Sequence, residues 1–179
     1  MRLHTAHTHE LAAADLAAIR AFLDTAFDGD FADDDWDHTL GGVHARVLDG
    51  GELLAHGSVV QRRVVHGRRA YRTGYAEGVA VRADRRREGL GGQVMAALER
   101  VLDGAYAVGA LSASASGAPL YTARGWEAWP GRLAALGPDG TVPLPEEEGS
   151  TYLRGVAGGP LPFPREGTLL FDWRDGDVL

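Results

Sequence analysis

The segment from Glu77 to Gly92 reads EGVAVRADRRREGLGG, and it decides the fold of this chain of 179 residues. An apolar, β-type run passes through an arginine- and glycine-rich loop straight into an alternating apolar helix, which is predicted to begin near Leu90. Because glycine has no Cβ to obstruct a ligand, backbone N–H groups at the helix start can point at a phosphate group, helped by the helix dipole. A plain glycine-rich turn is the alternative. The preceding strand and the arginines at 85, 86 and 87 favour a phosphate-binding loop.

Gly78 interrupts the strand that leads into this loop. A glycine inside a strand often marks a bulge or a close approach of a ligand to the backbone. A bulge would splay this strand from its parallel neighbour, expected at 107–112, and admit a thin pantetheine arm whose amides pair with the exposed backbone. The alternative is a bend in the sheet with nothing bound. Glu77 is then either a solvent-facing residue or a general base that takes a proton from an amine, directly or through water; we favour the base.

The rest of the chain predicts a single α+β domain over residues 1–179. Antiparallel strands followed by a strand–loop–helix unit and a further strand and helix are typical of a mostly antiparallel mixed sheet with flanking helices. The acidic region before Gly41 is predicted to be a loop and a short helix. Beyond Trp129 we expect a long loop with one or two short strands. Strands are predicted near 3–8, 43–48, 53–65, 70–82, 107–112 and 168–173, and helices near 15–27, 90–102 and 119–124.

Composition excludes several classes of mechanism. Hydrophobic residues make up 45% of the chain and charged residues 24%, which is ordinary for a globular domain. The absence of cysteine excludes a thiolate metal site and a cysteine nucleophile, and the absence of lysine excludes Schiff-base chemistry. All 18 basic residues are arginines, which bind anions through planar, bidentate contacts. No signal peptide or membrane span can be built from the N-terminal sequence, so we expect a cytoplasmic protein without a membrane partner.

The charges are segregated along the chain, although the net charge is only −7. Nine of the arginines lie between Arg62 and Arg87, and six aspartates lie in the acidic segment 28–37. Such an acidic run is often a solvated loop, but Phe31 and Trp36 are threaded among these carboxylates, which favours a partly buried wall that attracts a polycation. The same acidic segment disfavours a nucleic acid partner.

Two further groups of residues have alternative interpretations. Tyr121 is predicted to lie on a short helix after the strand at 107–112, where its hydroxyl can protonate a leaving thiolate; the alternative is a core tyrosine. His7 and His9 are predicted to share a strand face near His4, but no acidic or cysteine ligand accompanies them. We therefore expect surface histidines and no metal site.

These features resemble the GNAT superfamily of N-acetyltransferases, and within it the aminoglycoside 2′-N-acetyltransferases of the actinobacterial type. The resemblance covers nearly the whole chain. It rests on the segments Gly29-Asp30-Phe31, Asp35-Trp36, His38-Thr39-Leu40-Gly41-Gly42, Gln61-Arg62-Arg63, Gly74-Tyr75, Glu77-Gly78-Val79-Ala80-Val81-Arg82-Ala83-Asp84, Gly104-Ala105-Tyr106, Gly109-Ala110-Leu111-Ser112, Arg124-Gly125-Trp126, Asp172-Trp173-Arg174 and Gly176-Asp177-Val178.

The resemblance implies a GNAT fold with a splayed central strand pair, acetyl-CoA as the donor, an aminoglycoside as the acceptor, and a homodimer. It implies that Glu77 is the base and Tyr121 the acid. The implied acetyl-CoA site comprises Val79, Ala80, Val81, Arg86, Arg87, Glu88, Gly89, Leu90, Gly91 and Gly92. The implied aminoglycoside site comprises Asp30, Asp35, Trp36, Glu77, Ser112, Glu147, Asp177 and the terminal carboxylate of Leu179, which stands where members of the family commonly have tryptophan.

Two other functions are compatible with the same residues. One is a GNAT enzyme that acetylates another polyamine, an amino sugar or a peptide amine. The other is a protein that binds acyl-CoA or the drug without chemistry, against which the presence of both Glu77 and Tyr121 argues. A polyamine sugar with several ammonium groups needs a carboxylate-rich receptor, so the acidic segment favours the aminoglycoside.

Overall fold

The computed structural model describes all 179 residues, which form two compact units. The first unit comprises Met1–Val60 and Ala76–Val101, and the second comprises Gln61–Tyr75 and Leu102–Leu179. The strands are β1 (Arg2–His7), β2 (Val43–Asp49), β3 (Glu52–His66), β4 (Arg69–Val81), β5 (Val108–Ser112), β6 (Glu127–Ala128), β7 (Arg132–Gly137), β8 (Gly140–Pro143), β9 (Thr151–Gly155) and β10 (Thr168–Asp172). The α-helices are α1 (Ala13–Ala26), α2 (Asp33–Thr39), α3 (Leu90–Ala105) and α4 (Ala118–Thr122), with short 3₁₀ turns at Thr8–Glu10, Ala83–Arg85, Pro145–Glu147 and Val156–Gly158.

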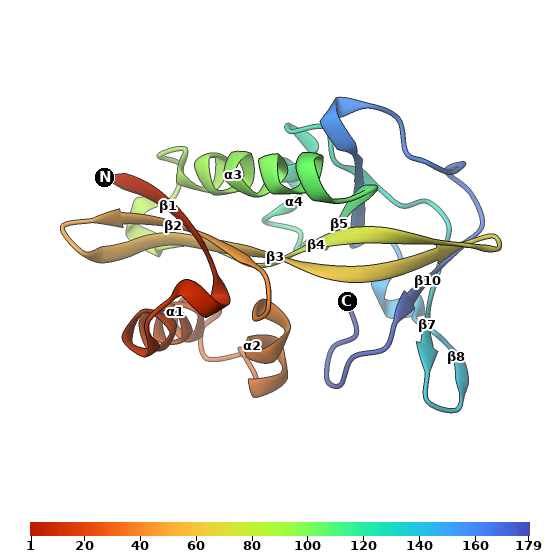
Figure 1. The fold of residues 1–179 in the computed structure, drawn as a ribbon, viewed down its shortest axis with the longest axis horizontal. Coiled ribbons are helices and arrows are strands. Elements are labelled where there is room, and N and C mark those ends of the chain that lie inside the picture. The colour runs from red at the N-terminus through yellow and green to blue at the C-terminus, as the bar shows by residue number, and fades with distance from the viewer. The chain divides into compact units, whose positions relative to one another are not determined.

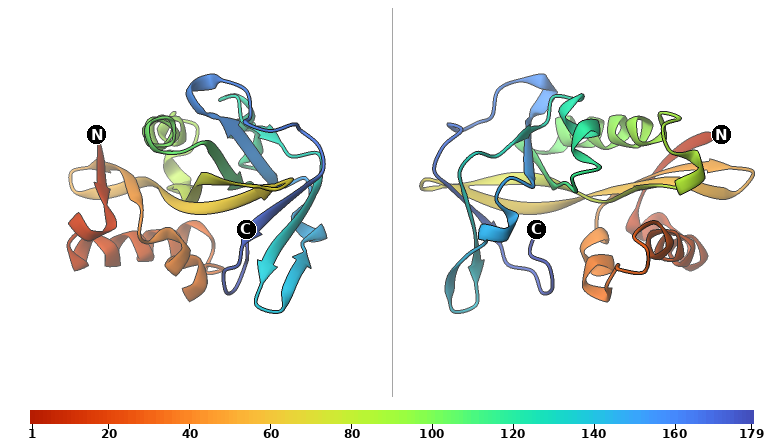
Figure 2. Two further views of the ribbon diagram at one scale, coloured as in Figure 1. Left: turned by 45° about the vertical axis from the view of Figure 1, so that its right-hand side comes forward. Right: turned by 180° about the vertical axis from the view of Figure 1, so that it is seen from behind.

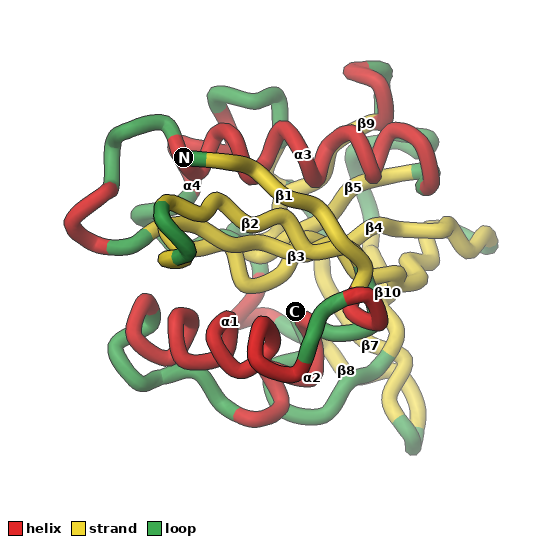
Figure 3. Tube along the Cα trace, turned by 60° about the vertical axis from the view of Figure 1, so that its left-hand side comes forward, coloured by secondary structure: helices red, strands yellow, loops and turns green.

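In the first unit, helices cover both faces of an antiparallel arrangement of β1, β2 and β3. β2 pairs with β1 on one side and with β3 on the other. Helices α1 and α2 lie on one face of these strands, and α3 lies on the other (Figures 1 and 3). The apolar stripe of α1 explains its side: Ile19 and Leu23 are fully buried in a cluster with Leu11, against which Phe31 and Trp36 pack.

The close packing of α3 on β3 requires a glycine. A Cβ at Gly57 would lie 2.8 Å from Cγ1 of Val94 and 3.0 Å from Cδ1 of Leu98, both on α3. The absence of a side chain on β3 therefore lets the helix approach the strand. The predicted phosphate loop, residues 82–89, connects the end of β4 at Val81 to the start of this helix at Leu90.

The second unit is a mixed set of strands in the order β6-β9-β5-β4-β3-β10-β7-β8. The parallel pairs are β4 with β5 and β10 with β7, and β7 and β8 form a hairpin at the end of the order (Figure 2). Trp126 fills the space beside β5, where a Cβ at Gly109 would lie 3.0 Å from its ring. Helices and a mixed, mostly antiparallel sheet confirm the predicted α+β class.

The prediction for the region beyond Trp129 was wrong. That region contains β7, β8 and β9 before the predicted last strand, where one or two strands were expected. Prolines made it resemble a loop, but Pro143 lies on β8 at the end of the strand order, where a missing N–H is tolerated. Because the other prolines fall in turns or at strand ends, their density marks connections between short strands.

The histidines near the N-terminus also differ from expectation. β1 ends at His7, and His9 lies in the following 3₁₀ turn with its Nδ1 2.8 Å from Nδ1 of His7. The two residues therefore do not share a strand face. No group of three or more histidine, cysteine, aspartate or glutamate side chains is arranged to hold a metal ion. None of the helices is long and apolar enough to cross a membrane.

Candidate active site

Gly78 forms a kink in β4 within the first unit. Its φ is +53°, a left-handed conformation that favours glycine, and a Cβ there would lie 3.1 Å from Thr39 and 3.3 Å from Leu23. β4 pairs with β5 at Thr73–Tyr75 and then continues past the kink to Val81. Ala76 is buried, whereas the residues from Glu77 to Val81 are all half-buried. The left-handed Gly78 lies directly after Glu77, and the bulge expected here stays a prediction.

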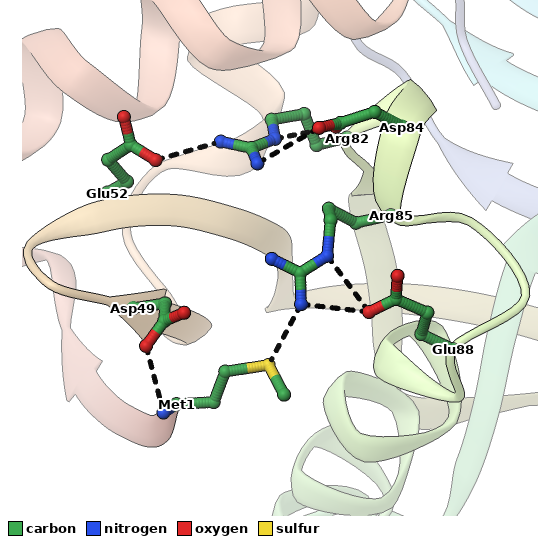
Figure 4. Close-up of polar contacts among 7 residues, drawn as sticks. All are labelled: Met1, Asp49, Glu52, Arg82, Asp84, Arg85 and Glu88. Carbon is green, nitrogen blue, oxygen red and sulfur yellow. Dashed lines mark hydrogen bonds and ion pairs between the residues drawn. The ribbon is translucent and has the colours of Figure 1, made fainter.

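Two arginines of the loop after β4 form ion pairs (Figure 4). Arg82 donates to Asp84 at 2.7 Å and to Glu52 at 3.0 Å, and Arg85 binds Glu88 at 2.8 Å. These hydrogen bonds raise the pKa of both guanidinium groups. Arg82 and Arg85 thus shape the loop, and Glu88, predicted to contact acetyl-CoA, binds Arg85.

The next part of the loop keeps the features of an anion site. Arg86 and Arg87 are exposed, and Arg86 makes a long contact of 3.4 Å to the carbonyl of Val81. Arg87 has a φ of +67° and Gly89 a φ of +80°, which turn the chain sharply into α3. Gln93 donates to the Gly89 carbonyl at 3.1 Å, so the helix ladder begins here. The N–H groups of Leu90, Gly91 and Gly92 belong to the first turn, where the helix itself supplies no acceptor.

The acidic segment contains helix α2 and packs against the core of the first unit. Asp35 accepts a hydrogen bond from the N–H of Ala32 at 2.8 Å and thereby caps α2. Phe31 and Trp36 are half-buried against the core of the first unit, whereas Asp30 is exposed. The prediction that the aromatic residues anchor this segment is confirmed. One oxygen of Asp35 is occupied by its capping role.

Ser112 and Glu147 come together in the second unit, although 35 residues separate them in sequence. The hydroxyl of Ser112 donates to Oε2 of Glu147 at 3.1 Å, and Ser150 donates to the same oxygen at 3.0 Å. Two hydroxyl donors hold this half-buried carboxylate in one orientation. The pair can present a fixed negative charge to a cationic ligand.

Tyr121 lies on α4 in the second unit and is 7% exposed. Its ring is within 6.4 Å of both Trp126 and Tyr152, centroid to centroid. Burial raises the pKa of the Tyr121 phenol to about 12. The hydroxyl therefore keeps its proton at neutral pH and can act as a hydrogen-bond donor or as a general acid.

A buried arginine holds the last residues of the chain. Arg62 on β3 is 2% exposed and donates to Asp172 Oδ1 at 2.9 Å, to the Asp172 carbonyl at 2.6 Å and to the Val178 carbonyl at 2.6 Å. Its guanidinium also lies 4.9 Å from the ring centroid of Tyr75. Burial and the nearby Arg174 lower the pKa of Arg62, and Asp172 opposes this shift. We call these contacts the Arg62 clamp; no pattern in the sequence indicated this role for Arg62.

Two buried histidines in the first unit were also missed. Nδ1 of His44 on β2 lies 3.0 Å from Nε2 of His56 on β3, and both side chains are fully buried. Burial is the largest cause that lowers the pKa of His44 to about 4 and that of His56 to about 3. Both rings are therefore neutral near pH 7. The only sequence signal was a histidine between apolar or small residues in each of the two strands, His44 after Val43 and His56 after Ala55.

The predicted site residues divide between the two units. In the first unit lie Glu77, Asp30, Asp35, Trp36, Val79, Ala80, Val81 and the loop residues Arg86 to Gly92. In the second unit lie Tyr121, Ser112, Glu147, Asp177 and Leu179. Asp177 is exposed and Leu179 is half-buried, directly after the residue that the Arg62 clamp holds.

The sequence and the fold match known acetyltransferases. The family described as "Acetyltransferase (GNAT) domain" matches residues 7–129. The aminoglycoside 2'-N-acetyltransferase of Mycolicibacterium fortuitum is 46% identical over 182 residues, which cover 98% of this chain and 92% of that protein.

Among solved structures, a GNAT family N-acetyltransferase (YhbS) from Escherichia coli in complex with CoA superposes with a TM-score of 0.67 at 17% identity, covering 95% of this chain and 88% of that chain. A GNAT family acetyltransferase from Brucella melitensis in complex with acetyl-CoA gives a TM-score of 0.60 at 16% identity and covers 94% of each chain. The chain spans only about a third of the length of three larger structures that it also matches, at 32%, 33% and 34%.

Proposed function

The chain belongs to the GNAT acetyltransferases, and on that premise we propose that it transfers the acetyl group of acetyl-CoA to the 2′-amine of aminoglycoside antibiotics and so confers resistance. The identity of 46% over almost the whole length of an aminoglycoside 2'-N-acetyltransferase carries this proposal. We propose one acetyltransferase domain over residues 1–179. We also propose a cytoplasmic location and, on the resemblance alone, a homodimer.

The loop from Arg86 to Gly92 supports the binding of the donor. Two exposed guanidinium groups and the free N–H groups of a helix start suit a pyrophosphate. The half-buried backbone of Val79, Ala80 and Val81 supports the pairing of a pantetheine arm with β4. The ion pairs of Arg82 with Asp84 and of Arg85 with Glu88 shape the loop.

Carboxylates support the recognition of a polycationic acceptor. The acidic segment of the first unit contains Asp30, Asp35 and the half-buried Trp36. In the second unit, Glu147 is held by Ser112, and the Arg62 clamp fixes the residues that lead to Asp177 and Leu179. Each carboxylate can bind an ammonium group of the drug.

The chemistry requires one proton to leave and one to arrive. The neutral amine forms a C–N bond to the thioester carbonyl carbon, the C–S bond breaks, and the sulfur departs with the electron pair. Glu77 accepts the amine proton, directly or through water, and Tyr121 gives its proton to the sulfur. Burial keeps that proton on Tyr121 until charge develops on the sulfur.

Mass spectrometry of a small drug panel with acetyl-CoA tests the function. Gentamicin, tobramycin and kanamycin B carry a 2′-amine and should gain one acetyl group, whereas kanamycin A carries a hydroxyl there and should gain none at that position. Equal modification of kanamycins A and B would refute the regiochemistry. Turnover of polyamines, amino sugars or peptides alone would indicate a different acceptor, and tight drug binding without a gain in mass would indicate a binding protein.

The roles of the two catalytic residues are tested by kinetics. We expect Tyr121→Phe to lower kcat by about 10²–10⁴-fold with little change in either KM, because a general acid acts in the transition state. Glu77→Gln should reduce the rate most at low pH, where the acceptor amine is protonated, and should leave acetyl-CoA binding intact. Calorimetry with acetyl-CoA is the control for folding. Wild-type rates in both variants would reduce these residues to packing roles.

A further inference from the structure

Four hydrogen bonds run in series through the first unit and end on the kink of β4. The N–H of Gly41 donates to Oγ1 of Thr8 at 2.9 Å, and that hydroxyl lies 2.9 Å from Nε2 of His44. Nδ1 of His44 lies 3.0 Å from Nε2 of His56. Nδ1 of His56 lies 2.9 Å from the carbonyl oxygen of Gly78. We call this series the histidine relay.

Only one arrangement of protons satisfies every contact. A carbonyl oxygen can only accept, so His56 carries its proton on Nδ1, and its Nε2 must accept from Nδ1–H of His44. Nε2 of His44 then accepts from the hydroxyl of Thr8. The alternative partner of that hydroxyl is the Gly42 carbonyl at 3.2 Å. If the Thr8 hydroxyl donated to that carbonyl instead, His44 would carry its proton on Nε2. The lone pairs of His44 Nδ1 and His56 Nε2 would then face each other at 3.0 Å.

The end of the histidine relay fixes the orientation of one peptide group. No peptide bond in the chain is cis, and the C=O and N–H of a trans peptide point in opposite directions. Holding the Gly78 carbonyl toward His56 therefore sets the direction of the Val79 N–H. The same hydrogen bond also limits backbone rotation at Gly78, the residue that follows Glu77. Glycine itself places no side chain in the way of such rotation, so the hydrogen bond from His56 adds a restraint to those of the strand pairing.

We propose that His56 is a positioning residue that, held by His44 and Thr8, fixes the Gly78–Val79 peptide and the adjacent Glu77 for acetyl transfer. This inference rests on the proposed function, in which Glu77 is the base and β4 receives the pantetheine arm. A left-handed residue in a strand changes the direction of the backbone beside Glu77. The relay gives the Gly78–Val79 peptide a single orientation, since each of its members has only one partner that completes the series.

Substitutions at His56 separate positioning from packing. Asparagine can place its side-chain N–H where Nδ1 of histidine lies, whereas glutamine reaches the position of Nε2 and cannot donate to the Gly78 carbonyl in the same way. We expect His56→Gln to lower kcat about tenfold with KM nearly unchanged, which is the loss expected for one hydrogen bond. His56→Asn should keep a kcat close to that of the wild type. Equal kcat values for the two folded variants would overturn the proposal.

A milder pair of substitutions acts at the far end of the relay. Thr8→Val removes the hydroxyl that donates to His44 and keeps the shape of the side chain, and Thr8→Ser keeps the hydroxyl. We expect Thr8→Val to lower kcat about threefold and Thr8→Ser to leave it unchanged, because the serine still fixes the His44 proton. Circular dichroism and urea unfolding check that both variants fold. A wild-type kcat in Thr8→Val would contradict the role of the relay.

Nitrogen-15 NMR of the wild-type protein tests the proton arrangement without any acceptor or variant. At pH 7 both rings should be neutral with the proton on Nδ1. A proton on Nε2 of either ring would overturn the relay. The Gly78 carbonyl and Val79 amide resonances should stay near their wild-type positions in His56→Asn and shift in His56→Gln. If the wild-type enzyme acetylates no aminoglycoside, the proposed function fails, while these resonances still decide the positioning of the peptide.

Discussion

The two units bury polar side chains in different charge states, neutral histidines in the first and a charged arginine in the second. In the first unit, His44 and His56 are buried without a charge, and each imidazole has a partner that suits its neutral form. In the second unit, Arg62 is buried with its charge, and two backbone carbonyls and a carboxylate accept its N–H groups. Both arrangements fix a short piece of backbone near a predicted site residue.

The difference lies in how each network responds to its surroundings. An imidazole can lose its proton, so burial shifts its pKa and removes the cost of a buried charge. A guanidinium group does not lose its proton in proteins, so its burial must be offset by hydrogen bonds and by contact with aromatic rings. The histidine relay should therefore be sensitive to pH, and the Arg62 clamp to the loss of any one partner.

Acidification should have the largest effect. Because the pKa values of His44 and His56 are lowered in the folded state, the unfolded chain binds more protons below pH 6.5, and stability falls as the pH falls. At pH 5 each histidine should cost about 2 kcal/mol, or about 4 kcal/mol together. Urea unfolding at pH 7 and pH 5 measures this loss. The variant with asparagine at both positions is the control and should lose much less; an equal loss would mean that other groups carry the pH dependence.

Removal of the buried guanidinium should have the next largest effect. We expect Arg62→Met to lower the free energy of unfolding by about 3 kcal/mol, because Asp172 loses its buried donor and the Val178 carbonyl keeps only the 3.3 Å contacts from Arg174. Arg62→Lys keeps the charge but not the planar fork, and should lose roughly half as much. Hydrogen exchange should increase selectively at residues 172–178. Between pH 7 and pH 5 the loss should be constant, in contrast to the relay.

Stiffening the backbone at the end of the relay should have a moderate effect. Gly78→Ala forces a residue with a Cβ into a left-handed conformation and brings that Cβ within 3.1–3.3 Å of Thr39 and Leu23. We expect a loss of about 1–2 kcal/mol in urea unfolding. Gly104→Ala is the matched control, since a Cβ at that helical position meets nothing within 4 Å. A loss in the control as large as in Gly78→Ala would show that the strain at the kink is not the cause.

The exposed ion pairs of the loop should matter least. The side chain of Glu52 is 74% exposed, and its partner Arg82 also binds Asp84. Water and salt screen such pairs, so Glu52→Gln should leave the urea midpoint unchanged. Repeating the measurement at two salt concentrations checks this expectation. A shift comparable to that of Gly78→Ala would indicate that the loop is coupled to the folding of the first unit.

The sequence predicted the parts of the site that depend on local rules. A glycine inside a strand indicated irregular backbone at Gly78, where φ is left-handed, and a glycine-rich run after a strand indicated the start of α3. The aromatic residues among the aspartates indicated that the acidic segment is anchored. The roles of Ser112 and Glu147 came only from the resemblance, because no local pattern relates residues that meet across the strands of the second unit.

The histidine relay could not be predicted, because it depends on a bulge in β3, where Leu54 is the extra residue between Leu53 and Ala55. With a regular hairpin from Asp49↔Glu52, His44 would face residue 57, and His56 would lie on the opposite face of the sheet. The register instead shifts between Val47 and Leu48, so that His44 pairs with Ser58. His44 and His56 then point to the same face. One extra residue, which no turn motif in the sequence indicated, therefore brings the two histidines onto the same face and allows the relay to form.

The Arg62 clamp also has a consequence for the order of events during synthesis. Arg62 and the Val178 carbonyl are 116 residues apart in sequence, so their contact closes a long loop and belongs to the slow, nonlocal part of folding. All residues of the first unit leave the ribosome before residues 102–179 do. Until the segment around Asp172 and Val178 has emerged, the guanidinium of Arg62 must remain hydrated, and β3 cannot bury it. The nascent chain can therefore complete its first unit early, while the second waits for its last strand.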